Sequence, residues 1–223
     1  GLQYRSYLLS GLPADAGTGP PGFSGAPGIS NGRSSGARSA AEDFAWVGRV
    51  DATPIEGVLL GGSLYTGQAD QGMNDFAGQD VPVTVWEGHA KAEYRGLQRK
   101  ALYTEGRIGN AAAVNRAQGV ALGANGGVGS RLFGGYVEAA FNVLSLTPTK
   151  HSLTPFFRYE RYDTQARVPE NYAKNGANSR VEYTAGLTYK PIPQVAIKGD
   201  HQWLRNQAQT GVSQWNLGLA YLF

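Results

Sequence analysis

The most restrictive feature of this sequence is a strict alternation of apolar residues with polar or small ones over its last eleven positions, 213–223. The apolar series consists of Trp215, Leu217, Leu219, Tyr221 and Phe223. Because successive side chains of a β-strand point to opposite faces, this period of two predicts a strand with one apolar face. Aromatic rings at the end of such a strand suit a membrane interface better than water, so the pattern favours a transmembrane β-strand.

The composition narrows the class of protein further. Hydrophobic residues make up 41% of the chain, the mean hydropathy is −0.32, and no apolar run is long enough for a transmembrane helix. A membrane barrel remains compatible with these values, because alternating strands hide half of their apolar signal. The absence of cysteine excludes disulfides and thiol chemistry. The 20 basic and 17 acidic residues are interspersed, without the Lys/Arg run of a nucleic-acid surface.

Alternation recurs along the chain and predicts ten strands. They span residues 2–10, 43–53, 57–66, 82–95, 97–108, 133–145, 153–165, 179–190, 195–205 and 212–223. Most of these segments are long enough to cross a bilayer at a tilt. We therefore expect an all-β fold, an antiparallel transmembrane β-barrel, forming one domain over residues 1–223.

The connections between these segments alternate between long and short. Residues 11–42, 67–81, 109–132 and 166–178 are long and polar or Gly-rich, whereas the others are compact turns. This asymmetry is typical of outer-membrane barrels, and an even strand count puts both chain ends on the short-turn side.

The longest connection, 11–42, allows two interpretations. Its Gly, Pro, Ser and Ala content favours a flexible linker. In a barrel it would be a long external loop, mobile or folded inward to narrow the pore. Within the connection 109–132, residues 110–117 are compatible with a short helix, and the glycines of 119–129 are not.

Each predicted strand presents a charged or polar face and an apolar face. We assign the apolar parity to lipid and the charged parity to a water-filled lumen, since unpaired charges in a dry core would cost several kcal/mol. The expected pore-lining residues are Arg49, Asp51, Glu87, His89, Lys91, Glu93, Arg95, Arg99, Glu105, Arg107, Glu138, Arg158, Glu160, Arg180, Glu182, Lys190, Lys198 and Asp200. The expected lipid-facing residues are Trp46, Trp86, Tyr94, Phe141, Phe157, Tyr159, Tyr183, Tyr189, Trp215, Tyr221 and Phe223. Lys100 and Arg161 fall on the lipid parity, close to strand ends, where a charge costs little.

No motif in the sequence predicts catalysis, a metal site or a cofactor. His89, His151 and His201 lack a second ligand at metal-binding spacing. The stretch 123–129 is glycine-rich, but no Gly-Lys-Ser/Thr follows it as in a phosphate-binding loop. Carboxylate pairs such as Glu87 with Glu93, or Glu105 with Glu138, could do acid–base work. Nearby Lys and Arg residues make salt-bridged lumen walls the simpler interpretation.

Several of these segments, in the same order, resemble strands of a known family. They are Val47–Gly57, Leu60–Gly67, Gly135–Leu144, Thr154–Asp163, Gly186–Pro193, Val195–Asp200 and Leu217–Phe223. They resemble the phosphate-selective porin O and P family of Gram-negative outer membranes. The resemblance implies a barrel of about sixteen strands, a homotrimer, passive diffusion of small solutes, and a last strand that the outer-membrane assembly machinery recognises. Ten strands then suggest the carboxy-terminal portion of a larger barrel, with a complete ten-strand barrel as the alternative.

The lumen charges argue against strong anion selectivity. Nine basic residues face eight acidic ones in the expected lumen set, whereas an anion-selective pore needs a positive excess. We therefore expect a bacterial outer-membrane porin for small hydrophilic solutes or ions, with lipid as its surroundings and no role in nucleic-acid binding. The alternatives are an outer-membrane barrel enzyme of the protease or lipase type, and a soluble β-sandwich binding module. Sandwich strands average about 5–6 residues, and those predicted here are about twice as long.

Overall fold

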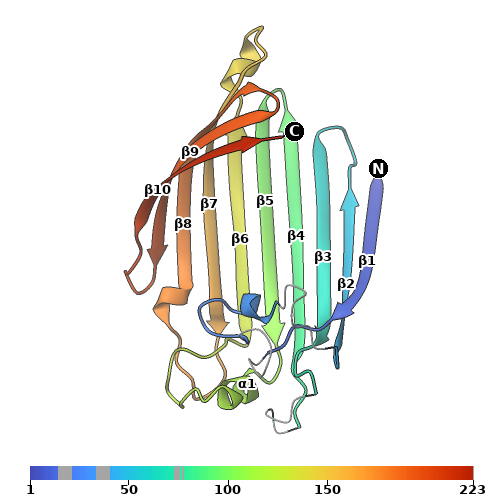
Figure 1. Cartoon of the computed structure of the whole chain (residues 1–223), viewed down its shortest axis with the longest axis vertical. Coiled ribbons are helices and arrows are strands. Elements are labelled where there is room, and N and C mark those ends of the chain that lie inside the picture. Colours follow the sequence, from blue (N-terminus) through green and yellow to red (C-terminus); the bar gives the residue numbers. More distant parts are fainter. Residues whose placement is uncertain (15–21, 34–40, 73–75, 77, 223) are drawn as a thin grey trace.

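The protein folds into one antiparallel sheet of ten strands, each paired with its neighbours in chain order (Figure 1). The computed structural model describes residues 1–14, 22–33, 41–72, 76 and 78–222. The strands are β1 (Leu2–Ser10), β2 (Phe44–Ala52), β3 (Val58–Gln68), β4 (Pro82–Tyr94), β5 (Leu97–Ile108), β6 (Arg131–Phe141), β7 (Ser152–Arg167), β8 (Ser179–Ile192), β9 (Val195–Asn206) and β10 (Ser213–Tyr221). The helical elements are α1 (Ala111–Ala117) and the single-turn 3-10 helices η1 (Ser30–Gly32), η3 (Val143–Leu146) and η4 (Gly176–Asn178). None of the helices in the described residues has the length and apolar character needed to cross a membrane.

The predicted all-β, antiparallel fold is confirmed, and all ten strands lie within a few residues of their expected bounds. The short helix expected at 110–117 is also found, as α1. The largest difference is at 133–145, where β6 ends at Phe141. There the Oδ1 of Asn142 accepts hydrogen bonds from the backbone N–H of Leu144, at 3.2 Å, and of Leu153, at 3.0 Å. The chain therefore turns into η3 instead of extending the strand.

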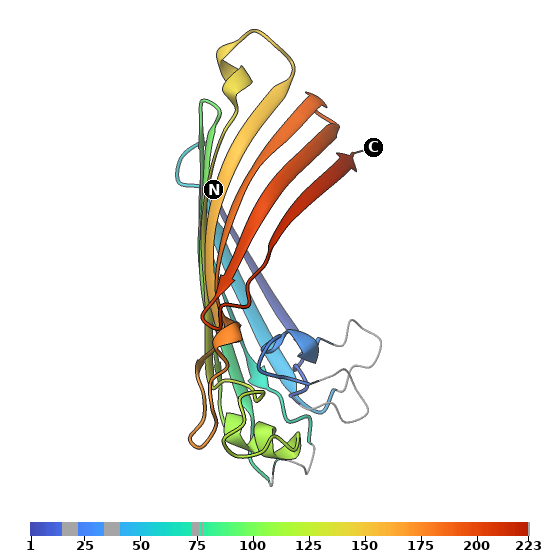
Figure 2. The ribbon, with the colours of Figure 1, turned by 90° about the vertical axis from the view of Figure 1, so that its left-hand side faces the viewer.

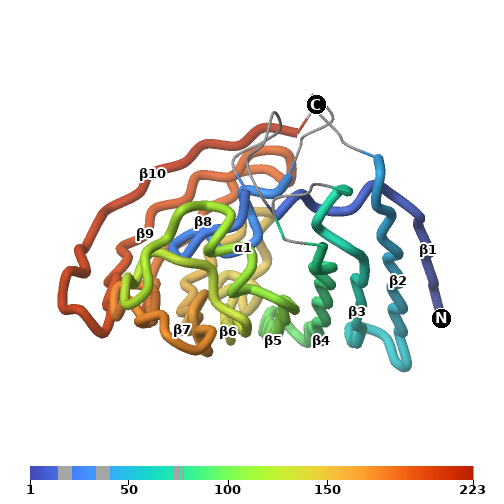
Figure 3. Tube along the Cα trace, turned by 90° about the horizontal axis from the view of Figure 1, so that it is seen from below, coloured from blue at the N-terminus to red at the C-terminus, as the bar shows by residue number. Residues whose placement is uncertain are grey.

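The sheet is bent into a trough rather than closed into a barrel (Figures 2 and 3). Within the described residues, β1 pairs only with β2 and β10 only with β9. The long connections gather at one end of the trough and the short turns at the other, where Gly1 and the end of β10 also lie (Figure 1). The predicted asymmetry of the connections is therefore present, and the sheet keeps two open edges.

The buried core lies in the long connections, inside the trough at its long-connection end (Figure 3). It joins residues of three connections to the ends of the strands, namely Ala14, Phe23, Ala69, Phe76, Val81, Val83, Ile108, Ala111, Ala113, Val114 and Val128. Tyr65, Val85 and Leu132 of the sheet pack against it. This cluster, which we call the loop plug, thus covers one face of the sheet at one end only.

Residues 22–33 are an ordered part of the loop plug, so the flexible-linker interpretation is wrong for them. The side-chain amide of Gln118 donates to the carbonyls of Ala14, at 3.0 Å, and Phe23, at 2.7 Å. Gly25 N donates to Gly126 O at 3.0 Å, and Thr164 Oγ1 donates to Gly25 O at 2.5 Å. This part of the segment is therefore folded inward, whereas residues 15–21 and 34–40 lie outside the described residues.

Phe23 offers a direct test of the loop plug, because its side chain is fully buried there. Replacing a buried Phe by Ala usually costs about 3–5 kcal/mol, and Phe23→Ala should remove stability of this order from the loop plug alone. We expect faster proteolysis within 22–33 and unchanged β-sheet circular dichroism. Leu122→Ala is the matched control, since Leu122 is exposed in another long connection; equal sensitivity of the two variants would contradict this packing.

Candidate functional site

The strand register gives the sheet two chemically distinct faces. Residues directly opposite each other in an antiparallel ladder share a face. Asp51 is opposite Gly61, which is opposite His89, and this row lies on the same side as Tyr65 and Val85, which the loop plug covers. We call this side the concave face and the other, which carries Trp46 and Trp86, the convex face.

Most of the predicted pore-lining residues lie together on the concave face. They are Arg49, Asp51, Glu87, His89, Lys91, Glu93, Glu138, Arg158, Glu160, Arg180, Glu182, Lys190, Lys198 and Asp200. Arg95 is in the two-residue turn between β4 and β5, in a left-handed backbone conformation with φ of 46°. It therefore belongs to the short-turn end rather than to a strand face.

The prediction was wrong for Arg99, Glu105 and Arg107, which lie on the convex face. Because the β4–β5 turn holds two residues, Tyr94 is opposite Leu97, and odd positions of β4 share a face with even positions of β5. The prediction assigned odd positions to the lumen in both strands and therefore placed every side chain of β5 on the wrong face. The same register moves Lys100 to the concave face, opposite Lys91 and Glu138. It also separates Glu105 from Glu138, so these two carboxylates cannot act as a pair.

The convex face carries the described residues that were expected to meet lipid. They are Trp46, Trp86, Tyr94, Phe141, Phe157, Tyr159, Tyr183, Tyr189, Trp215 and Tyr221, whereas Phe223 lies outside the described residues. Many of these side chains are strongly exposed, and β10 is the extreme case, with Leu217 at 85%. Arg161 also lies on this face, as expected.

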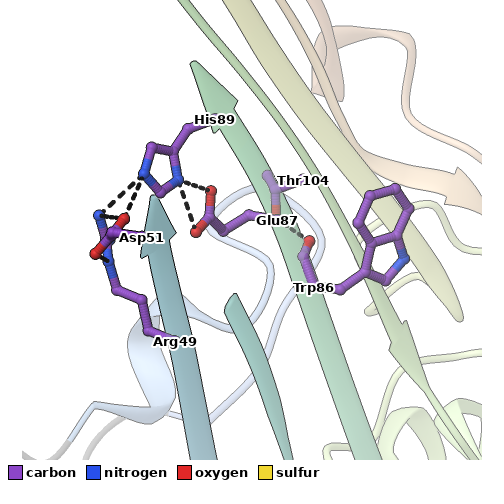
Figure 4. A network of polar contacts seen from close by, with 6 residues as sticks. All are labelled: Arg49, Asp51, Trp86, Glu87, His89 and Thr104. Atoms are coloured by element: carbon purple, nitrogen blue, oxygen red, sulfur yellow. Dashed lines mark hydrogen bonds and ion pairs between the residues drawn. The ribbon is translucent and has the colours of Figure 1, made fainter. Parts of the chain in front are cut away.

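On the concave face, His89 stands between two carboxylates (Figure 4). Its Nδ1 is 2.9 Å from Glu87 Oε2, and its Nε2 is 2.9 Å from Asp51 Oδ1. Arg49 closes the group with a bidentate contact to Asp51, at 2.7 and 2.9 Å. The four side chains come from β2 and β4 and meet across Gly61 of β3, and Asp51, Glu87 and His89 are largely shielded from water.

A second ion-pair group is centred on Glu138. Lys100 Nζ donates to Glu138 Oε1 at 2.8 Å, and Arg158 reaches Oε2 through Nη2, also at 2.8 Å. The Arg158 guanidinium also lies 4.3 Å from the centre of the Tyr136 ring. Further along, Tyr162 donates to Glu182 at 2.7 Å, and Lys198 lies 3.4 Å from Asp200. The carboxylates of this wall are therefore paired with neighbouring cations or hydroxyls.

The concave wall is close to electrically neutral in the part of the chain that the structure describes. The strands place eight basic residues on it, namely Arg5, Arg49, Lys91, Lys100, Arg158, Arg180, Lys190 and Lys198. Seven acidic ones accompany them, namely Asp51, Glu87, Glu93, Glu138, Glu160, Glu182 and Asp200. Such a surface can bind water and transient ions of both signs without a strong preference.

Among the described residues, no three His, Asp or Glu side chains are arranged to hold a metal ion. His151 and His201 lie apart from the concave wall: His151 Nδ1 is 2.9 Å from the Tyr189 hydroxyl, and the His201 ring packs 4.5 Å from that of Trp215. These two histidines therefore take part in the convex and turn surfaces.

Sequence reasoning missed Gln165, which joins two of the long connections. Its buried amide donates to Gly127 O at 2.6 Å and accepts from Asn175 N at 2.8 Å. A single Gln in an alternating strand gives no signal for such a role, because its partners come from residues far away in the chain.

Asp43 ties together three segments at the long-connection end. Its carboxylate accepts from Gln71 N at 2.6 Å, and its carbonyl accepts from Gly11 N at 2.8 Å. Burial raises the pKa of the Asp43 carboxyl, as do the nearby charges of Asp70 and Asp80, while the hydrogen bond from Gln71 opposes this shift.

Comparison with known proteins finds a similar sequence and a similar structure. No family model matches the chain. An uncharacterized protein of Aquifex aeolicus (strain VF5) is 25% identical over 210 residues, which are 90% of this chain and 45% of that protein. The crystal structure of a BenF-like porin from Pseudomonas fluorescens Pf-5 superposes with a TM-score of 0.46 and 11% identity, over 81% of this chain and 48% of the porin. The chain thus spans about half the length of each of these proteins.

The raised pKa of Asp43 makes the stability of this end depend on pH. Below the ordinary carboxyl pKa, Asp43 is protonated in both the folded and the unfolded state, so it does not reduce stability. As the pH rises through the raised pKa of the folded protein, stability falls. Asp43→Asn keeps an acceptor for Gln71 N and cannot ionise. We expect slower hydrogen–deuterium exchange at Gln71 and Gly11 than in the wild type near neutral pH, and no difference in acid. A slowing of exchange that is equally large near neutral pH and in acid would contradict this assignment.

Proposed function

We propose that this chain forms part of an outer-membrane β-barrel channel in which small hydrophilic solutes or ions diffuse along the concave face. The observation that carries the proposal is the contrast between the two faces of the sheet. One exposes large apolar side chains from β1 to β10, and the other is charged, ion-paired and partly covered by the loop plug.

The convex face has the size and pattern of a surface that meets lipid. Exposed apolar patches on soluble monomers rarely exceed a few hundred Å², whereas large exposed apolar residues continue here from β1 to β10. Trp86 and Tyr94 lie eight residues apart on β4, about 27 Å along a strand. At a strand tilt of about 40° this distance spans roughly 21 Å of the membrane normal, close to the ~25 Å apolar band between the aromatic girdles of membrane barrels.

The concave face supports a wet interior. Fifteen charged side chains on one sheet face would be costly in a dry core. Water in a lumen would solvate the charges that the ion pairs do not neutralise. A β-sandwich needs a second sheet to bury its apolar face, and the described residues form one sheet. The two-layer alternative is therefore disfavoured.

The open edges of β1 and β10 support a larger barrel. An unpaired edge leaves a row of backbone N–H and C=O groups without partners, which lipid cannot satisfy. We propose that further strands pair with both edges, in a barrel of about sixteen strands of the phosphate-selective porin O and P type that assembles as a homotrimer. Recognition of β10 by the outer-membrane assembly machinery belongs to the same proposal.

The charges of the concave wall favour weak ion selectivity. With eight basic residues facing seven acidic ones, this portion offers no cationic ladder of the kind that selects anions. The loop plug, which occupies one mouth of the trough, is the natural size filter.

A barrel enzyme is the second candidate, because the Asp51–His89–Glu87 group resembles a catalytic arrangement. General-base catalysis needs a ring nitrogen that can accept a proton from a nucleophile. Both nitrogens of His89 already lie within 2.9 Å of carboxylate oxygens, which favours a structural role. Ester or peptide hydrolysis by the purified protein that is abolished in His89→Gln would support the enzyme instead.

The channel proposal predicts opposite outcomes for two neighbouring cations. Lys100→Gln removes a charge from the concave wall, so the reversal potential in a salt gradient should move toward cation preference. Arg99→Gln, on the convex face, should leave it unchanged. The shift should shrink near 1 M salt, where the Debye length is about 3 Å. Planar-bilayer recording of the full-length protein measures both.

Two results of that recording would contradict the proposal. The absence of any conductance would overturn the channel itself. A shift for Arg99→Gln as large as that for Lys100→Gln would show that the concave face is not the conducting wall.

A further inference from the structure

Two adjoining hollows lie on the convex face, toward the end with the long connections. The first has a volume of about 670 Å³ and is lined by charged groups that include Arg131, Arg161, Lys174 and Arg205. The second has a volume of about 640 Å³ and is lined mainly by apolar and aromatic residues. They share Tyr103, Phe133 and Arg161, so a basic hollow opens directly onto an apolar one.

The basic hollow contains more positive charge than its own carboxylates neutralise. Arg131 pairs with Glu105 at 2.6 Å and Lys174 with Asp163 at 2.5 Å. Arg161 and Arg205 flank Val181 in one row of the sheet. Neither guanidinium forms an ion pair or hydrogen bond within the described part of the chain, although that of Arg161 lies 5.9 Å from the centre of the Phe133 ring. Two exposed guanidinium groups are therefore available to an anion from outside.

A row of arginines beside this hollow reinforces the charge. Arg107, Arg131 and Arg167 are directly opposite one another on β5, β6 and β7. Like charges opposite each other destabilise a sheet, and Glu105 is the carboxylate that Arg107 and Arg131 share. This local cost would be offset by a bound anion.

The apolar hollow extends along β4 and β5 away from these arginines, and we call it and its continuation the groove. Its floor is made of small residues, Gly88, Ala90, Ala101 and Gly135, and its walls include aromatic rings of β5, β6 and β7. It continues into a third hollow of about 390 Å³, through the shared residues Ala90, Ala101 and Val137. From Gly88 to Ala92 the groove follows β4 for about 13 Å, toward the short-turn end.

We propose that these hollows bind one anionic lipid, its phosphate-bearing headgroup against Arg161 and Arg205 and an acyl chain along the groove. The proposal rests on the proposed function, since it requires the convex face to lie in a bilayer. A free phosphate would use the basic hollow and leave the groove empty. A lipid accounts for both, because its charge and its apolar chain match two surfaces that meet at Arg161.

Native mass spectrometry can test this site with the full chain released from micelles that contain phosphatidylglycerol and phosphatidylcholine in equal amounts. The wild type should retain phosphatidylglycerol in preference. A Lys or Arg near an anionic lipid surface contributes roughly a fivefold gain in affinity. Arg161→Gln with Arg205→Gln should therefore weaken retention of phosphatidylglycerol about twenty-five-fold. Arg95→Gln, at the opposite end of the sheet, is the matched control and should have no effect.

Two further experiments distinguish a lipid from a free phosphate, and failure of the lipid site from failure of the proposed function. Ala101→Phe fills the groove and should reduce retention of the lipid, while competition by inorganic phosphate as strong as by phosphatidylglycerol would overturn the lipid in favour of a free anion. Flotation with phosphatidylcholine vesicles tests membrane insertion independently. Failure of the wild type to float would contradict the proposed function. Flotation without any preference for phosphatidylglycerol would overturn the lipid site alone.

Discussion

The antiparallel pairing register is the constraint on which the rest of this structure depends. A slip of one residue in any ladder would exchange the two faces of a strand, moving charges to the apolar side and aromatic rings to the charged side. The ion pair of His89 with Asp51 joins β4 to β2 across β3, and those of Glu138 join β6 to its neighbours β5 and β7. They form only in the observed register and therefore stabilise it. The fold and the charged wall thus have a common physical origin.

The loop plug follows from the same division of the sheet. In the proposed membrane setting, lipid solvates one face and water the other, so the sheet needs no dry interior. The buried apolar cluster forms where long connections fold back onto Tyr65, Val85 and Leu132. Hydrogen bonds from Gln118 and Gln165 hold these connections together. The loop plug is consequently both the buried core of the protein and the element that narrows the trough.

Alternation in the sequence was sufficient to predict the ten strands and the two chemistries of the sheet, and the residue types of 110–117 indicated the short helix. Alternation failed at Arg99, Lys100, Glu105 and Arg107. The number of residues in the turn, and not the pattern within either strand, decides which positions of β5 share a face with those of β4. For residues 22–33, the content of glycine and proline favoured a flexible linker over the inward-folded loop that the structure shows. Their order comes from Phe23 and from partners about a hundred residues away, such as Gln118, which local propensity does not encode.

The central claim is that the concave face meets water and the convex face meets lipid. The chain contains no cysteine, so single substitutions along β9, such as Ile197→Cys and Lys198→Cys, give an unambiguous readout with a membrane-impermeant thiol reagent. In intact membranes we expect fast labelling at 198, 200 and 202, and slow labelling at 197, 199 and 201, a period of two. Equal labelling rates at both sets of positions would contradict the account.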